Sequence, residues 1–245
     1  MISDFQGYPV RIRRKAFMRN MNLQIHMSGS MQITAGKLAS PKQILKFLNQ
    51  NKQWINTVQE DHKKVRDKYP RKQFIENESF PYLGNELPLK IVVGEFKVLK
   101  LIFFATHLRC ELPQNKEFQY SDYRRALIRC YEKAGRRWLA CRVDYWSEIM
   151  KLYPKKVSVR SQKTRWGSCS SEGHISLNWR LLAAPLPVLD YVVIHELAHL
   201  QHHNHSKAFW KLVEKYDGNH KYHRQWLRDH QWAFDFLAQK SELFP

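Results

Sequence analysis

The sequence contains no long hydrophobic run. Its most apolar stretch, residues 98–108, is interrupted by Lys100 and is well short of the roughly 20 residues that a membrane-spanning helix needs. The start of the chain also lacks the apolar segment of a secretory signal. We therefore expect no membrane association and a location in the cytoplasm.

Cysteine is scarce, and its spacing does not suggest a metal site. The four cysteines lie far apart, with no Cys-x-x-Cys pair: Cys110, Cys130, Cys141 and Cys169. This argues against a disulfide framework and against a zinc site made of cysteines. We expect reduced, mostly structural thiols, as is usual in the cytosol.

Negative charge is also in short supply, and the resulting positive charge is unevenly placed. The formal net charge of the 245 residues is +19. Residues 1–75 contain 15 Lys and Arg against 4 Asp and Glu, and residues 121–165 contain 13 against 4, whereas residues 76–120 and 166–245 are nearly balanced. Such blocks are able to bind phosphates, nucleic acid or an acidic partner. A solvated basic surface that promotes solubility is an equal alternative.

Strand-like patterns dominate the first half of the chain. Residues 8–35 alternate between apolar and polar, with a turn at Ser28, Gly29 and Ser30, which predicts short antiparallel strands. Ser40 and Pro41 predict the start of a helix with apolar spacing over residues 44–58. Further strand-like runs occur at residues 80–83, 89–93, 98–105 and 108–112. We predict an α+β fold, with a β-rich region containing one helix at residues 1–118 and a mainly helical domain with a small sheet at residues 119–245.

Residues 121–150 predict a long amphipathic helix with one basic face. Apolar residues recur at intervals of four and three, as in a stripe that packs into a core: Leu127, Tyr131, Ala134, Trp138, Cys141 and Tyr145. Arg125, Arg129, Lys133 and Arg136 occupy another face. This basic face is a candidate surface for nucleic acid or a nucleotide.

A His-Glu-Leu-Ala-His motif at residues 195–199 lies in an apolar-periodic segment that follows Pro185 and Pro187. His195 and His199 are four residues apart, so they project from one face of a helix and both imidazoles can reach one ion. Glu196 is placed to accept a proton from water. The motif predicts a zinc site that carries its own general base.

A third ligand is required, and His205 is at a workable distance. In a continuous helix it would lie about 9 Å beyond His199 along the axis, so we expect the chain to leave the helix near residues 200–204 and to turn back at Asn204. His202 and the carboxylate of Glu214, on the following helix, are rival candidates.

Several segments together resemble the YgjP-like metallopeptidase family. They are Arg-Trp-Gly-Ser-Cys at 165–169, Ile-Ser-Leu-Asn at 175–178, the segment 189–200 with the histidine motif, Asn-His-Ser at 204–206 and Phe-Trp at 209–210. The strong match covers about residues 157–232, and the WLM and SprT-like proteases are more distant relatives. The spacing of the three histidines equals that of metzincins, but no methionine follows Met150, so the Met-turn of metzincins is absent.

The resemblance implies a zincin-like catalytic domain that acts on peptides or proteins. It assigns one Zn²⁺ to His195, His199 and His205 and the catalytic carboxylate to Glu196, and it leaves the substrate-binding residues open. The strand at 174–179 is either an edge strand that pairs with an extended peptide or an ordinary core strand.

Other residues near the motifs have two readings each. Arg165 either stabilises an oxyanion or forms a local salt bridge, and Trp166 either contacts substrate or packs beneath the metal-binding helix. We expect the remaining C-terminal histidines to face solvent: His220, His223 and His230.

Three functions are compatible with these features. The first is a metallopeptidase that uses Glu196 to activate water. The second is a metal-dependent nucleoside triphosphate pyrophosphatase, an activity described for members of the family, although the sequence has no Walker-type loop and no acidic cluster for magnesium. The third is a nucleic-acid-associated protease, as the SprT-like proteases are.

Overall fold

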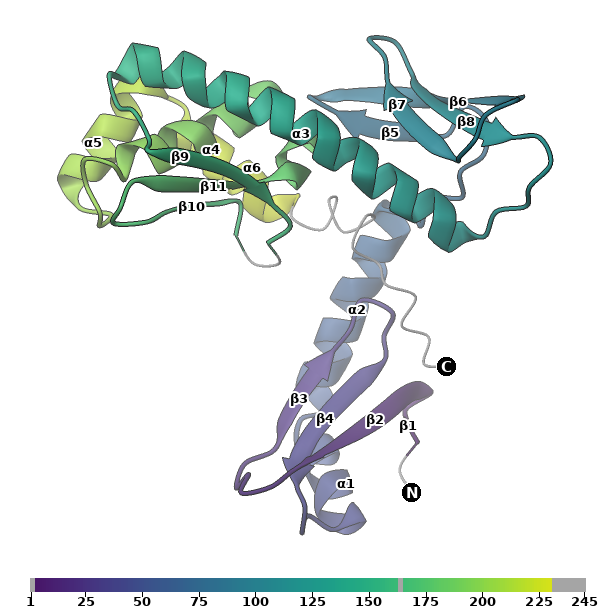
Figure 1. Ribbon diagram of the computed structural model, residues 1–245. Helices are drawn as coiled ribbons and strands as arrows, with labels where there is room; N and C mark the ends of the chain where they lie inside the picture. Colours follow the sequence, from purple (N-terminus) through teal and green to yellow (C-terminus); the bar gives the residue numbers. More distant parts are fainter. Residues whose placement is uncertain (1–2, 163–164, 231–245) are drawn as a thin grey trace. The chain divides into compact units, whose positions relative to one another are not determined.

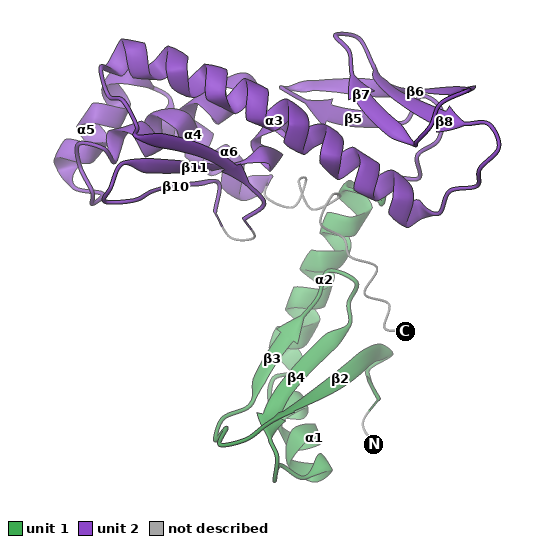
Figure 2. Cartoon of the chain, viewed as in Figure 1, with its two compact units in different colours: residues 1–71, 238–245 green, residues 72–237 purple. Residues whose placement is uncertain are grey.

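Figure 1 shows the protein as a computed structural model, in which residues 3–162 and 165–230 are described. Within them the fold is mixed, with six α-helices, one short 3-10 helix and three small sheets. The described residues up to Arg71 form unit 1, and those from Lys72 onward form unit 2 (Figure 2). None of the described helices is long and apolar enough to cross a membrane.

Unit 1 begins with four strands: β1 (Asp4–Phe5), β2 (Tyr8–Lys15), β3 (Asn22–Ile25) and β4 (Met31–Gly36). The predicted turn is present, because Gly29 adopts a φ of +88° between β3 and β4, which are antiparallel. The prediction of antiparallel strands throughout was wrong, since β2 and β4 are parallel. The sheet order is β1-β2-β4-β3, so β4 occupies the place beside β2 that a simple hairpin would give to β3.

Two helices follow where one was predicted: α1 (Pro41–Gln50) and α2 (Lys52–Lys68). Ser40 caps α1 as expected, because its side chain accepts a hydrogen bond from the backbone N–H of Gln43. The interruption lies at Asn51, whose side-chain amide donates to the carbonyl of Phe47 at 2.8 Å. Apolar side chains of the sheet and both helices form one core: Met31, Ile33, Ala35, Ile44, Leu48 and Ile55.

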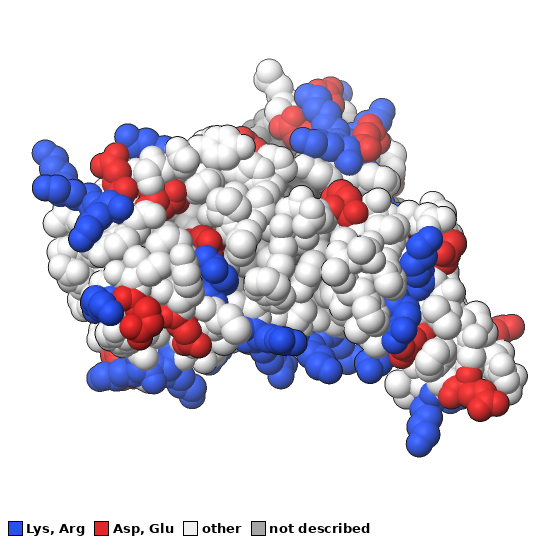
Figure 3. All heavy atoms as spheres, turned by 90° about the horizontal axis from the view of Figure 1, so that it is seen from above, with Lys and Arg blue, Asp and Glu red and all other residues white. Residues whose placement is uncertain are grey.

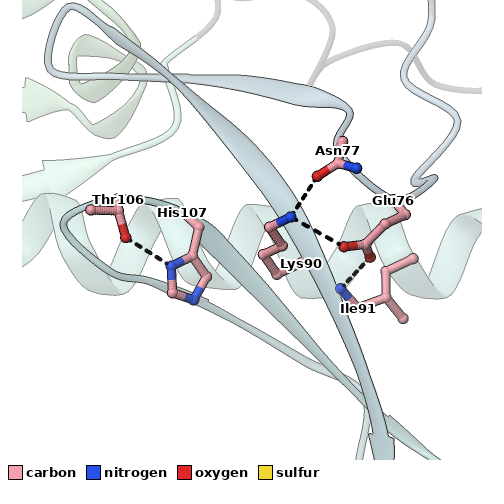
Figure 4. Close-up of polar contacts among 6 residues, drawn as sticks. All are labelled: Glu76, Asn77, Lys90, Ile91, Thr106 and His107. Carbon is pink, nitrogen blue, oxygen red and sulfur yellow. Dashed lines mark hydrogen bonds and ion pairs between the residues drawn. The ribbon is translucent and has the colours of Figure 1, made fainter.

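Unit 2 begins with the sheet β5-β6-β8-β7, made of β5 (Ser79–Tyr82), β6 (Asn85–Gly94), β7 (Lys100–Phe103) and β8 (Leu108–Pro113). Figure 4 shows how the segment before β5 is attached to this sheet. Lys90 donates to Asn77 at 2.6 Å, and the backbone N–H of Ile91 donates to Glu76 at 2.7 Å. The predicted strands of this region are all present, but they belong to the same unit as the helices that follow. The division therefore falls at residues 71–72, whereas the sequence suggested 118–119.

Helix α3 (Tyr120–Met150) connects the two halves of unit 2. The predicted apolar stripe is buried at Leu127 and Tyr131 but exposed at Trp138 and Tyr145, while the buried face moves to Leu139 and Val143. The reason is that different elements cover the helix along its length. Its first part packs on β7, and its later part packs on the second half of the unit. The predicted basic residues are all exposed: Arg125, Arg129, Lys133 and Arg136.

The second half of unit 2 contains β9 (Lys156–Arg160), β10 (Gly167–Cys169), β11 (His174–Asn178), the 3-10 helix η1 (Trp179–Ala183), α4 (Leu186–Ala198), α5 (Lys207–Tyr216) and α6 (His220–Asp229). The sheet order is β10-β11-β9. The interpretation of residues 174–179 as an edge strand was therefore wrong, because β11 is paired on both sides. Helix α4 is joined to α3 by a two-point ion pair, in which Arg142 contacts Asp190 through two contacts of 2.7 Å.

Candidate metal centre

The first two histidines of the candidate site lie at the end of α4. This helix is buried on nearly every side, which explains why its sequence is apolar around most of its circumference. His195 lies in the last turn, and His199 follows the last helical residue. The chain leaves the helix there, and the backbone N–H of His202 donates to the carbonyl of Ala198 at 2.9 Å.

The chain turns back as predicted, but without the expected conformation at Asn204. Asn204 is not among the described residues with positive φ. The turn is instead made by residues 199–201, directly after the helix. The backbone N–H groups of Gln201 and His202 both donate to the carbonyl of Ala198, the last residue of α4. The reversal of the chain therefore begins earlier than the sequence suggested.

His205 returns to the two helix histidines. Its Nε2 lies 3.1 Å from Nε2 of His195, and one nitrogen from each of His195, His199 and His205 lies within 4.8 Å of the others. The Nδ1 of His199 donates to the carbonyl of His202 at 3.0 Å, which leaves its Nε2 as the acceptor. A hydrogen bond of this kind fixes the tautomer of a metal-binding imidazole.

The rival third ligands do not take part in this cluster. Among the described residues, the group of His195, His199 and His205 is the one whose side-chain donor atoms converge closely enough to bind an ion. His202 offers its backbone carbonyl rather than its ring. Glu214 is exposed on α5 and is not part of the group.

Burial keeps the helix histidines neutral. Desolvation, together with the smaller effects of the neighbouring His199 and His205, lowers the pKa of His195 to about 3. Desolvation also lowers the pKa of His199. Because a transition metal binds the neutral form of imidazole, the site already favours the protonation state that a ligand needs. Three imidazoles are a donor set that suits zinc with one coordination position open.

Glu196 is the acidic group beside the imidazoles. Its side chain is buried, with 5% of the residue exposed, and its Oε2 has no hydrogen-bond partner within the described residues. Burial raises the pKa of this carboxyl to about 8, and the positive charge of Arg165 opposes the rise. A buried oxygen without a partner is costly unless something completes the site. The carboxyl is thus available for a water molecule or a substrate.

Gly167 of β10 is a site residue that the sequence did not single out. A Cβ atom at this position would lie 2.5 Å from Oε1 of Glu196 and 2.8 Å from its carboxyl carbon. Only glycine leaves room for the carboxyl at this place. The signal for it in the sequence is its place in the Arg-Trp-Gly-Ser-Cys segment at 165–169.

Aromatic rings from α5 support the three imidazoles. The fully buried ring of Phe209 lies 4.6 to 4.9 Å from the ring centroids of His195, His199 and His205. Trp210 stacks on His205 at 5.7 Å. Thus α5, whose start is capped by Ser206, positions the one ligand that does not come from α4.

The expectation that His220 and His223 face solvent was wrong. Both are buried, with 4% and 8% of the residue exposed. His220 also stacks on Trp210, at 5.6 Å, and Nδ1 of His223 donates to Asp217 at 2.8 Å. These histidines form a layer behind the ligands rather than a second metal site. His230 is half-buried and stacks on Trp226 at 4.1 Å.

Arg165 and Trp166 are adjacent in the sequence but differ in burial. Trp166 is half-buried and packs against the core of unit 2. This favours its interpretation as a packing residue over a contact with substrate. Arg165 is exposed, and within residues 3–162 and 165–230 it forms no ion pair. Its positive charge acts on Glu196, so Arg165 belongs to the surroundings of the candidate site.

Part of the chain is similar to known metallopeptidases. The metallopeptidase domain of the YgjP-like family matches residues 19–230. Two solved structures are similar over 38% of this chain: the metallopeptidase zymogen abylysin of Pyrococcus abyssi, with 27% identity over 95% of its chain and a TM-score of 0.35, and the metallopeptidase zymogen jannalysin of Methanocaldococcus jannaschii, with 16% identity over 96% of its chain and a TM-score of 0.35. No curated protein matches the chain.

The family match spans both units and includes the whole candidate metal centre, so the class of protein is a metallopeptidase. The chain belongs to the YgjP-like family. The expectation drawn from the sequence segments at 165–169, 175–178 and 189–210 is confirmed at this level. The assignment depends on the match to the family, because both TM-scores are below 0.5.

Proposed function

We propose that this protein is a zinc peptidase in which His195, His199 and His205 hold one Zn²⁺ and Glu196 is the general base. The observation that carries the proposal is the convergence of three imidazole nitrogens within 4.8 Å next to a buried carboxyl oxygen that has no partner. When bound, zinc supplies Lewis-acid chemistry, which polarises the scissile carbonyl and makes water more acidic.

The environment of Glu196 suits both halves of its proposed role. In the first half its carboxylate accepts a proton from the attacking water, and in the second it donates that proton to the leaving amine. Burial raises the pKa of this carboxyl to about 8, so the group holds a proton readily in the interval between the two transfers. Arg165 nearby favours the return to the charged form.

The open edge of β10 is the proposed place for the substrate backbone. β11 pairs with β9 on one side and with β10 on the other, so the free edge nearest Glu196 belongs to β10. Gly167 of this strand is in contact with the carboxyl of Glu196. An extended peptide that adds to β10 as a further strand would use backbone hydrogen bonds and would bring its own carbonyl groups close to the general base.

The test compares the wild-type chain with Glu196→Gln, which keeps the shape of the side chain but removes the base. Both are loaded with zinc, their metal content is measured, and both are given a set of unstructured peptides and a nucleoside triphosphate. We expect peptide cleavage by the wild type and a loss of about 100- to 10,000-fold in Glu196→Gln, with one zinc bound by each.

Two results would overturn the proposal. Peptide cleavage by Glu196→Gln at the wild-type rate removes Glu196 from the role of general base. Release of pyrophosphate from the triphosphate, lost in Glu196→Gln and accompanied by no peptide cleavage, assigns the same site to the pyrophosphatase reaction instead.

A further inference from the structure

Among the described residues, the sheet of unit 1 has one covered face and one open face. The fully buried side chains of Met31, Ile33 and Ala35 on β4 point toward α1 and α2. Because side chains alternate along a strand, the residues between them point the other way. Figure 1 shows α1 and α2 behind the sheet, and its other face is turned toward the viewer.

The open face is polar and basic. The strand register brings together three cations of β2 with amide and hydroxyl side chains of β3 and β4: Arg11, Arg13, Lys15, Asn22, Gln24, Gln32 and Thr34. The three cations are exposed. Successive ones are about 6.6 Å apart along the strand, because a strand rises about 3.3 Å per residue. Pro9 is the one apolar residue on this face of the three strands.

Little negative charge lies near Arg13 and Lys15 in the sequence. Residues 5–59 contain no Asp and no Glu. Asp4 pairs in register with Pro9, at the opposite end of β2 from Lys15, and its carboxylate accepts a hydrogen bond from the backbone of Gly7 at 3.0 Å. Arg14 points to the covered side and donates to the carbonyls of Gly36 and Ala39. Its charge therefore serves the loop after β4, whereas Arg13 and Lys15 have no ion pair among the described residues.

An exposed aromatic residue lies two positions beyond the last residue of β2. Phe17 follows β2, has a φ of +58° and is fully exposed. The backbone N–H of Lys37 donates to the carbonyl of Lys15 at 3.1 Å, so the residues that follow β4 lie beside the end of β2. Exposed rings next to a basic track are the arrangement on which proteins stack the bases of single-stranded nucleic acid.

We propose that the open face of unit 1 binds single-stranded nucleic acid, with backbone phosphates on Arg13 and Lys15 and a base stacked on Phe17. The charge row supplies complementarity to a phosphate chain. The amides of Gln24 and Gln32 are donors and acceptors of the kind that contact sugars and base edges. A membrane-binding surface would instead need a broad apolar face.

The basic face of α3 is the competing surface within the chain, and it is less favourable. Arg125 already contacts Asp122 in an ion pair, and Glu132 lies among the cations of the helix. No aromatic side chain interrupts the row of Arg129, Lys133 and Arg136. The open face of unit 1 differs from α3 in having no acidic side chain on β2, β3 or β4 and in having an exposed ring just beyond β2.

The experiment measures the anisotropy of a labelled oligo-dT of about 15 nucleotides, titrated with the full-length chain at several salt concentrations from about 50 mM upward. The test variant is Arg13→Gln/Lys15→Gln. The matched control is Lys42→Gln/Lys46→Gln, which removes the same charge from exposed positions of α1. A third variant, Arg129→Gln/Arg136→Gln, removes it from α3. Circular dichroism confirms that each variant is folded.

We expect Arg13→Gln/Lys15→Gln to weaken binding at least tenfold and to reduce the slope of log K against log salt by about 1.4, since each contact on a single strand contributes about 0.7. The α1 control should change the affinity less than threefold. Phe17→Ser should weaken binding about tenfold and leave the slope unchanged, because stacking does not release counterions.

Several outcomes overturn the proposal. They are no binding by the wild type at low salt, an equal loss in the α1 control, or a loss in the α3 variant alone. Binding to phosphatidylserine vesicles that Phe17→Ser abolishes, without binding to oligo-dT, assigns the face to a membrane instead. The peptidase proposal is tested separately, because Glu196→Gln should bind oligo-dT as the wild type does.

Discussion

The two units of this chain use charged and titratable side chains in opposite ways. In unit 2 the titratable groups His195 and Glu196 are desolvated. Burial lowers the pKa of His195 and raises that of Glu196, so both groups favour their neutral forms. In unit 1 the side chains of Arg13 and Lys15 on β2 are exposed to water. Burial prepares a group to bind a metal or to exchange a proton, whereas exposure preserves a charge for long-range attraction.

Net charge along the sequence points to the basic residues of unit 1 but not to the metal centre of unit 2. The positive charge of the sequence pointed to residues 1–75 and 121–165, and the metal centre lies in a segment where charges balance. Figure 3 shows one face of the molecule with a broad centre of mostly uncharged residues, and with Lys, Arg, Asp and Glu spread around its rim.

Removal of a metal ligand from unit 2 should have the largest effect. We expect His199→Ala to lose zinc and to lower peptidase activity by at least about 1000-fold, because two imidazoles no longer provide the donor set of a catalytic site. The control is His203→Ala, which changes an exposed histidine of the same segment. Zinc content by elemental analysis and peptide cleavage are the measurements, and normal zinc content in His199→Ala would show that the ligand set is different.

Zinc itself should act on stability as well as on activity. A ligand that binds only the folded chain stabilises it by about 2.7 kcal/mol when present at 100 times its Kd. We expect a chelator to lower the unfolding temperature of the wild type and to leave that of His199→Ala unchanged. An equal response of both proteins to the chelator would mean that the stabilising metal binds elsewhere.

Gly167→Ala should have the next largest effect. The new Cβ would lie 2.5 Å from Oε1 of Glu196, and displacement of a catalytic group by about 1 Å costs roughly 100-fold in rate. Gly218→Ala is the control, since nothing lies within 4 Å of a Cβ there. The rate constant of peptide cleavage is compared at equal zinc content. An active Gly167→Ala would show that Glu196 can move without loss.

Trp210→Ala should weaken zinc binding about 10- to 100-fold, the range known for residues that orient metal ligands. Trp210 stacks on His205, the exposed ligand, so its loss leaves that imidazole free to rotate. Trp226→Ala removes another tryptophan of the same unit, one that stacks on His230, and should leave the zinc affinity within threefold of wild type. Similar losses in both variants would indicate general destabilisation instead of ligand positioning.

Ile33→Ala changes the core of unit 1 and should have the smallest effect on catalysis. The side chain is fully buried in the core of unit 1, so its truncation should lower the stability of that unit by about 2–5 kcal/mol. Cleavage of short peptides should remain at the wild-type rate. Denaturant unfolding followed by two probes, one for each unit, is the measurement. Loss of peptidase activity in Ile33→Ala would show that the units are not independent in function.

Local patterns were predictable from the sequence, and contacts between distant segments were not. The histidine motif, the start of α1 and the length of α3 follow from short-range spacing. The parallel pairing of β2 with β4 depends on which strand occupies the place beside β2, and no residue type signals that choice. His220 and His223 were misassigned because burial by Trp210 and Asp217 is a tertiary effect that helical periodicity does not reveal.

The candidate site shows the same division. The three ligands lie within eleven residues, from His195 to His205, and their spacing was enough to suggest them. Gly167 was missed because its importance comes from contact with Glu196, a residue far along the chain. Phe209 likewise gave no signal beyond a family resemblance, although it contacts all three imidazoles.

The closeness of the ligands along the chain has a consequence for the order of folding. Closing a loop of about ten residues takes on the order of 10–100 ns, so the three imidazoles are able to meet as soon as α4 and α5 have formed. The contact of Gly167 with Glu196 must wait for β10 to join the sheet. The ligand set can therefore capture its metal early, before the substrate edge exists, so that metal capture accompanies folding instead of following it.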